Sequence, residues 1–162
     1  MPELSNFSRT ASWLSACGKQ PGNLQQTSVQ IGCFLEEVAE FIATLACSED
    51  STDIPYSIEN ALTELEHLSL RAKRGETVLF IKDGLQEKAL DALCDIEVTA
   101  NGVAYLSGWK KEGADKAVLD SNDAKLIDGK PVILRGGKIG KPDGWTAPEL
   151  SKFIPSYKDP IK

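Results

Sequence analysis

The sequence predicts an all-α protein on three observations. Apolar residues recur every three or four positions over most of the first 108 residues, which is the pattern of one face of a helix. Glycines stand where several of these runs stop, as they do after many helices. One short stretch near the C-terminus, centred on an Asp-Gly pair, has the composition of a hairpin. We therefore expect a helical bundle, then a small hairpin and an irregular tail.

The first half of the chain is expected to contain three helices. The first runs from about Asn6 to Cys17, and Gly18 ends it. A long second helix follows from about Thr27 to Cys47. Ser57 is expected to cap a third helix, because a serine hydroxyl accepts a hydrogen bond from the first helical turn. This third helix extends from about Ser57 to Arg74 and has an apolar stripe along one side.

The second half begins with another long helix. It is expected from about Leu85 to Gly108, and a weakly patterned fifth helix follows from about Ala114 to Asp123. Gly102 falls inside the longer one, where glycine costs about 1 kcal/mol relative to alanine. A hairpin is expected over residues 126–134, with Asp128-Gly129 at its turn.

The composition changes at Lys125, after which glycine, proline and lysine become frequent. We find no internal repeat and no second hydrophobic core in the sequence. Residues 1–124 are therefore expected to form one helical domain, and residues 125–162 a C-terminal extension. The glycines and lysines of 135–141 lack the G-x-x-x-x-G-K-[ST] spacing of a phosphate-binding loop, so we interpret them as turns.

Length, charge and hydropathy exclude some classes of function. The chain has 162 residues, and its net charge of −6 argues against a nucleic-acid binder that works through a basic stripe. An anionic small substrate is still allowed, because a bound metal can supply positive charge. No apolar run reaches the roughly 18 residues that span a membrane, and the polar N-terminus lacks the signal-peptide pattern. We expect a cytoplasmic protein.

The cysteines and the single histidine do not predict a zinc site. No two of the cysteines have C-x-x-C spacing. Cys33, Cys47 and Cys94 stand among apolar residues of helical segments, so we interpret them as small buried side chains of a reduced, intracellular protein. His67 lies off the apolar stripe of its helix and is expected to be an exposed polar residue.

An acidic cluster interrupts the apolar second helix. Glu36, Glu37 and Glu40 fall on one arc of it, because residues three and four apart share a helical face. Like charges at this spacing destabilise an isolated helix. Two explanations are open at this point: a solvated face, or a bound divalent cation.

A second pair of acids favours the cation. Asp91 and Asp95 are four residues apart on the otherwise apolar helix 85–108. If the two long helices pack together, the acids of both converge, and unpaired carboxylates in such a seam would be very costly. A hard cation such as Mg²⁺ resolves the conflict, because it takes oxygen ligands and also tolerates substrate phosphates.

The two acidic segments resemble a known family. Residues 36–40, E-E-V-A-E, match the E-E-x-x-E motif of the all-α nucleoside triphosphate pyrophosphohydrolases, the group of MazG, the phosphoribosyl-ATP pyrophosphohydrolases and the dimeric dUTPases. Residues 91–102 look like the second motif of MazG-like proteins of bacteriophages, and residues 140–142 and 148–153 resemble the tails of those proteins. One position departs from the pattern: the second motif is usually E-x-x-D, and Ala92 stands where its glutamate would be.

The resemblance implies hydrolysis of a (deoxy)nucleoside triphosphate to the monophosphate and diphosphate. It implies Mg²⁺ as cofactor, with Mn²⁺ as a substitute, held by Glu37, Glu40, Asp91 and Asp95. Glu36 would orient or deprotonate the attacking water. A phage-type member implies a role in the nucleotide pool of the host cytoplasm, with purine dNTPs (dGTP or dATP) as substrates.

The nucleoside would lie one or two helical turns from the acids. Candidate contacts are Gln30, Thr99 and Asn101. Trp13 or Trp109 would be able to stack on a base, but a core role is the expected one for both. The lysines at 82, 88 and 110 are interpreted as surface residues.

The resemblance also implies a homodimer or homotetramer, because the family completes its helical bundle by oligomerisation. The alternative hypotheses are an inactive nucleotide-binding relative and a non-enzymatic helical interaction module. In the last of these, the acids of residues 36–40 form a solvated face and the tail binds a partner.

Overall fold

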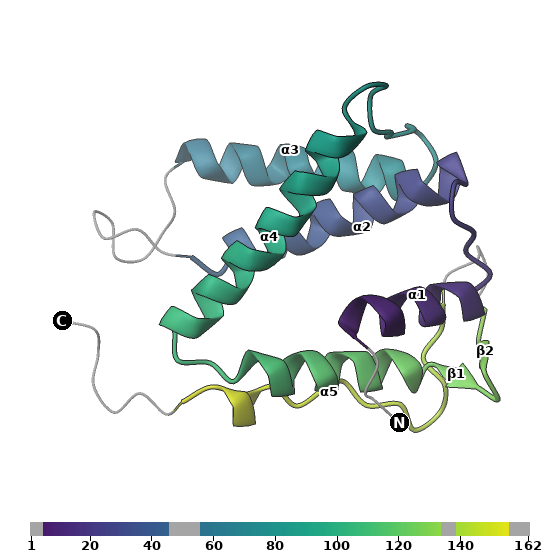
Figure 1. Cartoon of the computed structure of the whole chain (residues 1–162), viewed down its shortest axis with the longest axis vertical. Helices are drawn as coiled ribbons and strands as arrows, with labels where there is room; N and C mark the ends of the chain where they lie inside the picture. Colours follow the sequence, from purple (N-terminus) through teal and green to yellow (C-terminus); the bar gives the residue numbers. More distant parts are fainter. Residues whose placement is uncertain (1–4, 46–55, 134–138, 156–162) are drawn as a thin grey trace. The chain divides into compact units, whose positions relative to one another are not determined.

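A computed structural model describes residues 5–45, 56–133 and 139–155 of the chain. Over these residues it contains five α-helices, one two-stranded hairpin and a short 3-10 helix (Figure 1). The predicted all-α class with a small hairpin is therefore confirmed. The chain divides into two compact units, unit 1 with residues 1–19 and 84–162 and unit 2 with residues 20–83.

In unit 1, helix α1 spans Asn6–Ala16, within one residue of the expected bounds. The hydroxyl of Ser5 caps it by accepting a hydrogen bond from the Ser8 N–H at 3.2 Å. Beyond the end of the helix, Gly18 has a φ of +74°, which glycine adopts without steric cost. The predicted stop at this glycine is confirmed.

In unit 2, helix α2 spans Leu24–Ile42, so it begins three residues before the predicted start. The reason is Asn23, whose side-chain oxygen accepts from the Gln26 N–H at 3.0 Å and caps the helix. The helix also ends earlier than predicted. The Thr44 N–H and hydroxyl both donate to the Phe41 carbonyl, which turns the chain out of the helix. Residues 46–53 lie outside the described ranges.

Helix α3 spans Tyr56–Lys73 and lies alongside α2 (Figure 1). The prediction that Ser57 caps this helix is wrong, because the helix already includes Tyr56 and Ser57 is in its first turn. The two helices approach closely at Gly32: a Cβ built there would lie 3.0 Å from the Ser69 carbonyl oxygen and 3.1 Å from the Ala72 Cβ. A residue without a side chain therefore sets the spacing of this helix pair.

The segment after α3 is held to α2 by a buried serine. Ser28 is fully buried, and its Oγ accepts a hydrogen bond from the Leu79 N–H at 2.8 Å. We expect Ser28→Ala to lower the free energy of unfolding by about 1–2 kcal/mol, because this N–H loses its acceptor. Urea unfolding followed by circular dichroism measures the effect. Thr27→Ala, at an exposed neighbour, is the control, and equal losses in the two variants would contradict the role of Ser28.

The remaining helices belong to unit 1. Helix α4 spans Gln86–Leu106, close to the prediction, and α5 spans Lys111–Asp123, beginning three residues earlier than predicted. Gly113 in the first turn of α5 lies under the ring of Phe153: a Cβ at Gly113 would be 2.6 Å from the Phe153 Cε1. Phe153 ends the 3-10 helix η1, Ser151–Phe153, and its carbonyl accepts from the Lys110 N–H at 2.9 Å. The tail thus packs on the start of α5.

Two tryptophans attach other segments to the C-terminal end of α5. The indole N–H of Trp13 donates to the Asn122 carbonyl at 2.9 Å, and that of Trp145 donates to the Ser121 carbonyl at 2.9 Å. Lys141 lies over the Trp145 ring at 4.4 Å from its centroid. The structural role of Trp13 agrees with the core interpretation made from the sequence.

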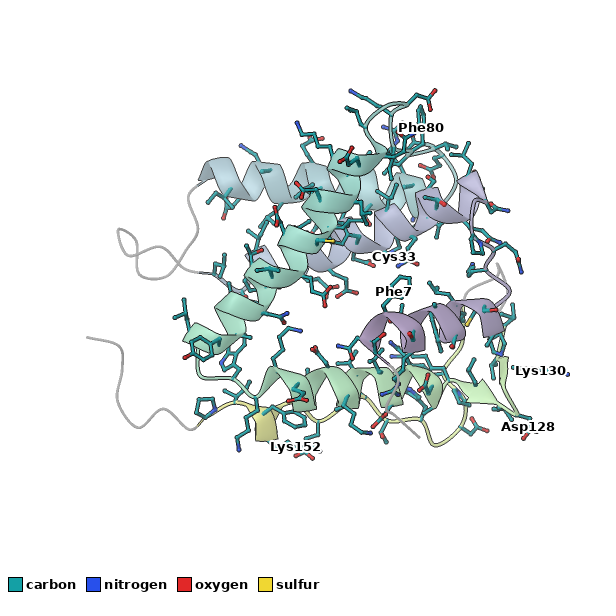
Figure 2. All side chains as sticks on the ribbon, in the orientation of Figure 1. Phe7, Cys33, Phe80, Asp128, Lys130 and Lys152 are labelled. Atoms are coloured by element: carbon teal, nitrogen blue, oxygen red, sulfur yellow. The ribbon has the colours of Figure 1, made fainter. Side chains whose placement is uncertain are left out.

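The hairpin pairs β1, Leu126–Ile127, with β2, Lys130–Pro131. Asp128 and Gly129 both have positive φ, 51° and 74°, which is the conformation of a type I′ turn. Asp128 and Lys130 are at the tip of the hairpin, where their side chains point outward (Figure 2). The turn confirms the predicted Asp-Gly hairpin, while Leu134, its predicted end, lies outside the described residues.

Charge pairs also join α1 to α5. Arg9 donates to Asp120 at 2.8 Å and to Asp123 at 2.6 Å, and Lys116 pairs with Asp120 at 2.8 Å. The hydrogen bonds from Lys116 and Arg9 lower the pKa of Asp120 below its ordinary value of about 4. The folded state therefore binds a proton at Asp120 less readily than the unfolded chain does. The ion pairs of Asp120 therefore stabilise the folded state above about pH 4, and this stabilisation is lost as the pH falls through the lowered pKa of Asp120.

We expect Asp120→Asn to make the loss of stability on acidification less steep below about pH 4. Thermal unfolding measured from pH 7 to pH 2.5 tests this. Asp143→Asn, which removes an exposed carboxylate of the same unit, is the control. A slope at acid pH that is the same for wild type and both variants would contradict the prediction.

The predicted division at residues 124 and 125 stays a prediction. The described part of the extension belongs, with α5, to unit 1. None of the helices in the described ranges is both long enough and apolar enough to cross a membrane.

Candidate functional site

Helix α2 presents the acidic cluster of residues 36–40. Ala39 is buried to 2% exposure, Glu36 is half-buried, and Glu37 and Glu40 are exposed. Cys33, one turn before Glu36, is half-buried on the same helix (Figure 2). The acids therefore stand at the edge of the apolar contact with α3 and are not buried within it.

Glu36 has a specific partner on α3. The Lys73 ammonium donates to Glu36 Oε1 at 2.5 Å, and both side chains are partly shielded from solvent. Beside this pair is a hollow of about 260 Å³, which we call the α2–α3 hollow. Its lining consists of two acids of α2 and four residues of α3: Glu36, Glu40, Glu66, Ser69, Leu70 and Lys73. The structure thus groups Glu36 with Glu40 and not with Glu37.

The electrostatics of the cluster show an excess of negative charge. The pKa of Glu37 is raised, first by partial desolvation of its carboxyl group and then by the charges of Glu40 and Glu36. Lys73 acts in the opposite direction. The charged form of Glu37 is therefore disfavoured mainly by partial burial and to a lesser extent by the neighbouring carboxylates.

Asp91 and Asp95 lie on α4, in the other unit. Both are exposed, and so are most of the apolar side chains of this helix, among them Leu93 at 51% and Val98 at 66%. Cys94 is also exposed, so the interpretation of Cys94 as a buried side chain is wrong. The error came from the apolar neighbours of Cys94, which are themselves exposed in a single chain.

The two sets of acids belong to different units, and their predicted convergence stays a prediction. Among the described residues, no three histidine, cysteine or acidic side chains form a group that could hold a metal ion. Carboxylate oxygens are the protein ligands that Mg²⁺ prefers. That Glu37, Glu40, Asp91 and Asp95 hold this ion is what the family resemblance implies, and it stays a prediction.

The residues predicted to contact the nucleoside are accessible. Gln30 on α2 and Asn101 on α4 are exposed. The hydroxyl of Thr99 donates to the Asp95 carbonyl at 2.8 Å, so its hydrogen is engaged by its own helix. Trp109 has 41% of its surface exposed, so it is not the buried core residue that the sequence predicted.

The part of the α2–α3 hollow that α3 supplies was not predicted from the sequence. Lys73 and Glu66 are far from the acidic motif in sequence, and neither belongs to an expected pattern. The signal in the sequence is that Lys73 follows directly after Ala72, the last residue of the apolar stripe of α3, so it stands at the edge of the face that packs on another helix.

No protein-family model, curated protein or solved structure matches this chain. The family expectation therefore rests on the two motifs themselves.

Proposed function

We propose that the protein is a Mg²⁺-dependent nucleoside triphosphate pyrophosphohydrolase that converts a dNTP and water into a dNMP and diphosphate. The acidic cluster of α2 carries the proposal, because Glu36, Glu37 and Glu40 place three like charges within five residues of one helix, and a bound cation would lower their mutual repulsion. The resemblance of residues 36–40 and 91–102 to the two motifs of the family supplies the reaction.

In the proposed reaction, the water oxygen forms a bond to the α-phosphorus and the bond from this phosphorus to the α–β bridging oxygen breaks. Diphosphate leaves with that oxygen. Glu36 accepts a hydrogen bond or a proton from the water. The hydrogen bond from Lys73 holds the Glu36 side chain in place for this task. Bound Mg²⁺ would offset the charge of the phosphate oxygens.

We propose that a second copy of the chain completes the site, in a homodimer or homotetramer. The exposed apolar side chains of α4 support this, because Tyr105 and Leu106 at its C-terminal end are 81% and 85% exposed. Large exposed apolar patches mark interaction sites. Asp91 and Asp95 lie on the same helix, so covering it would also shield the acids from water.

For the substrate class, we propose purine dNTPs, with dGTP or dATP preferred, and a cytoplasmic role in the nucleotide pool of a phage-infected host. The likeness of residues 140–142 and 148–153 to phage MazG-like tails supports this preference. Gln30 and Asn101 would contact the nucleoside. Mg²⁺ would be the cofactor, and Mn²⁺ would be able to substitute for it.

A panel of dNTPs and NTPs tests the function. Each nucleotide is incubated with the protein and Mg²⁺ or Mn²⁺ in water enriched in heavy oxygen, and the products are separated by chromatography. We expect the monophosphate to carry the heavy oxygen and diphosphate to carry none. Orthophosphate with a nucleoside diphosphate would contradict the proposed reaction. Binding without turnover would indicate an inactive relative, and neither binding nor turnover would indicate a helical interaction module.

A further inference from the structure

The lining of the α2–α3 hollow contains one cation and three carboxylates. Lys73 is the cation, and Glu36, Glu40 and Glu66 are the carboxylates. The ammonium of Lys73 donates a charge-assisted hydrogen bond to Glu36 Oε1. Lys73 is thus the one positively charged side chain among the residues that line the α2–α3 hollow.

The close approach of the two helices directs Lys73 toward Glu36. The Lys73 stem passes over Gly32, where a Cβ would lie 3.2 Å from the Lys73 Cγ. Glu36 is one turn beyond Gly32 on α2, within reach of the ammonium. The side chain of Lys73 is 28% exposed, against 60% for that of its neighbour Arg74. The lysine is therefore held by packing as well as by charge.

We propose that Lys73 is a built-in counter-cation, which holds Glu36 while the metal is absent and competes with the metal for the acidic cluster. This inference rests on the proposed function, because it assumes that the cluster binds a divalent cation. Lys73 acts through Glu36 and is a positioning residue. In the metal-free protein it lowers the repulsion among the carboxylates, and it weakens cation binding for the same reason.

The competition follows from the charges involved. An ammonium next to the cluster repels a divalent cation, and a carboxylate bound to that ammonium has less negative charge available. Removing the ammonium therefore has two opposite consequences. The metal-free protein becomes less stable, because Glu36 loses its partner near Glu37 and Glu40. The affinity for the cation becomes higher, because the cluster has more uncompensated charge.

Isothermal titration calorimetry with Mg²⁺ and with Mn²⁺ tests the proposal on the full-length protein. We expect Lys73→Met to bind either cation about three- to fivefold more tightly than wild type, the size of effect that a partly exposed ion pair allows. Without metal, the same variant should unfold at a lower temperature. Lys73→Gln serves as a second variant without the charge, and Lys73→Arg should behave as wild type.

Arg74→Met is the matched control, because it removes one positive charge from the next residue. Arg74 is 3.9 Å from Glu76 and is absent from the lining of the hollow. Its affinity for the cations should equal that of wild type. In a Glu36→Gln background, Lys73→Met should no longer tighten binding, because the residue through which it acts is gone.

Two failures can be told apart. If wild type binds Mg²⁺ or Mn²⁺ and both uncharged Lys73 variants bind with the same or lower affinity, the counter-cation role is overturned while the proposed function stands. If wild type, Arg74→Met and all the Lys73 variants bind neither cation, the metal site itself is overturned, and the proposed function fails with it.

Discussion

Replacing Glu40 by glutamine, or Asp95 by asparagine, is expected to slow Mg²⁺-dependent release of diphosphate by more than about 100-fold, which corresponds to about 2.7 kcal/mol of transition-state stabilisation. Each substitution keeps the shape of the side chain and removes the charge that a hard cation prefers. The two residues belong to different units of the chain. Similar losses in both variants would therefore indicate that α2 and α4 serve one site.

The controls lie on the neighbouring surface of the same units. Glu64→Gln removes an exposed carboxylate from α3, and Glu97→Gln removes one from α4, two residues beyond Asp95. Both should keep kcat/KM within about twofold of wild type, because substitutions of exposed residues have small effects. The double variant of Glu40 and Asp95 should lose little more than either single variant, since residues that act as a unit are not additive. Full activity in Asp95→Asn would show that α4 does not contribute to the active site.

The helices of this protein could be predicted because their apolar periodicity is strong, but their ends could not. Both missed boundaries of α2 depend on one polar side chain each. Asn23 caps α2 although it lies in a stretch with loop composition, and Thr44 ends the same helix by bonding back to Phe41. Ser57 has the chemistry of a cap and lies inside α3. Serine, threonine and asparagine can either cap a helix by bonding to nearby backbone groups or lie within it, and tertiary context selects between these positions.

The acidic residues of the candidate site could be found from the sequence, because charges in an apolar helix are conspicuous and motifs are local. Their surroundings could not. Lys73 meets Glu36 only because α3 packs antiparallel to α2, and that pairing brings together residues 37 positions apart. The exposure of Cys94 is a similar case. Its apolar neighbours predicted a buried position, whereas Cys94 and the adjacent Leu93 are both exposed.

Gly32→Leu is expected to lower the free energy of unfolding of unit 2 by about 3 kcal/mol, the upper part of the range for overpacking. A Cβ at this position would lie 3.0 Å from the Ser69 carbonyl oxygen, which is backbone and cannot turn away, and 3.1 Å from the Ala72 Cβ. Both neighbours are buried, so α3 would have to move outward. The movement would also break the hydrogen bond from the Ser69 hydroxyl to the Gly32 carbonyl, 2.8 Å long.

A series of substitutions separates packing from helix propensity. Alanine and leucine both favour a helix over glycine by up to about 1 kcal/mol, so propensity alone predicts that Gly32→Ala and Gly32→Leu stabilise the protein. Close packing predicts a loss that grows from alanine to leucine. Thr27→Leu, at an exposed position of the same helix, should change stability by less than about 0.5 kcal/mol. Urea unfolding of the three variants decides between the two accounts, and stabilisation by Gly32→Ala would show that the helix pair yields at this contact.

The same substitution is expected to affect the acidic cluster, because Lys73 passes over Gly32 to reach Glu36. A steric clash in Gly32→Leu should move Lys73 and so change the affinity of the cluster for a divalent cation. Thr27→Leu should leave that affinity unchanged.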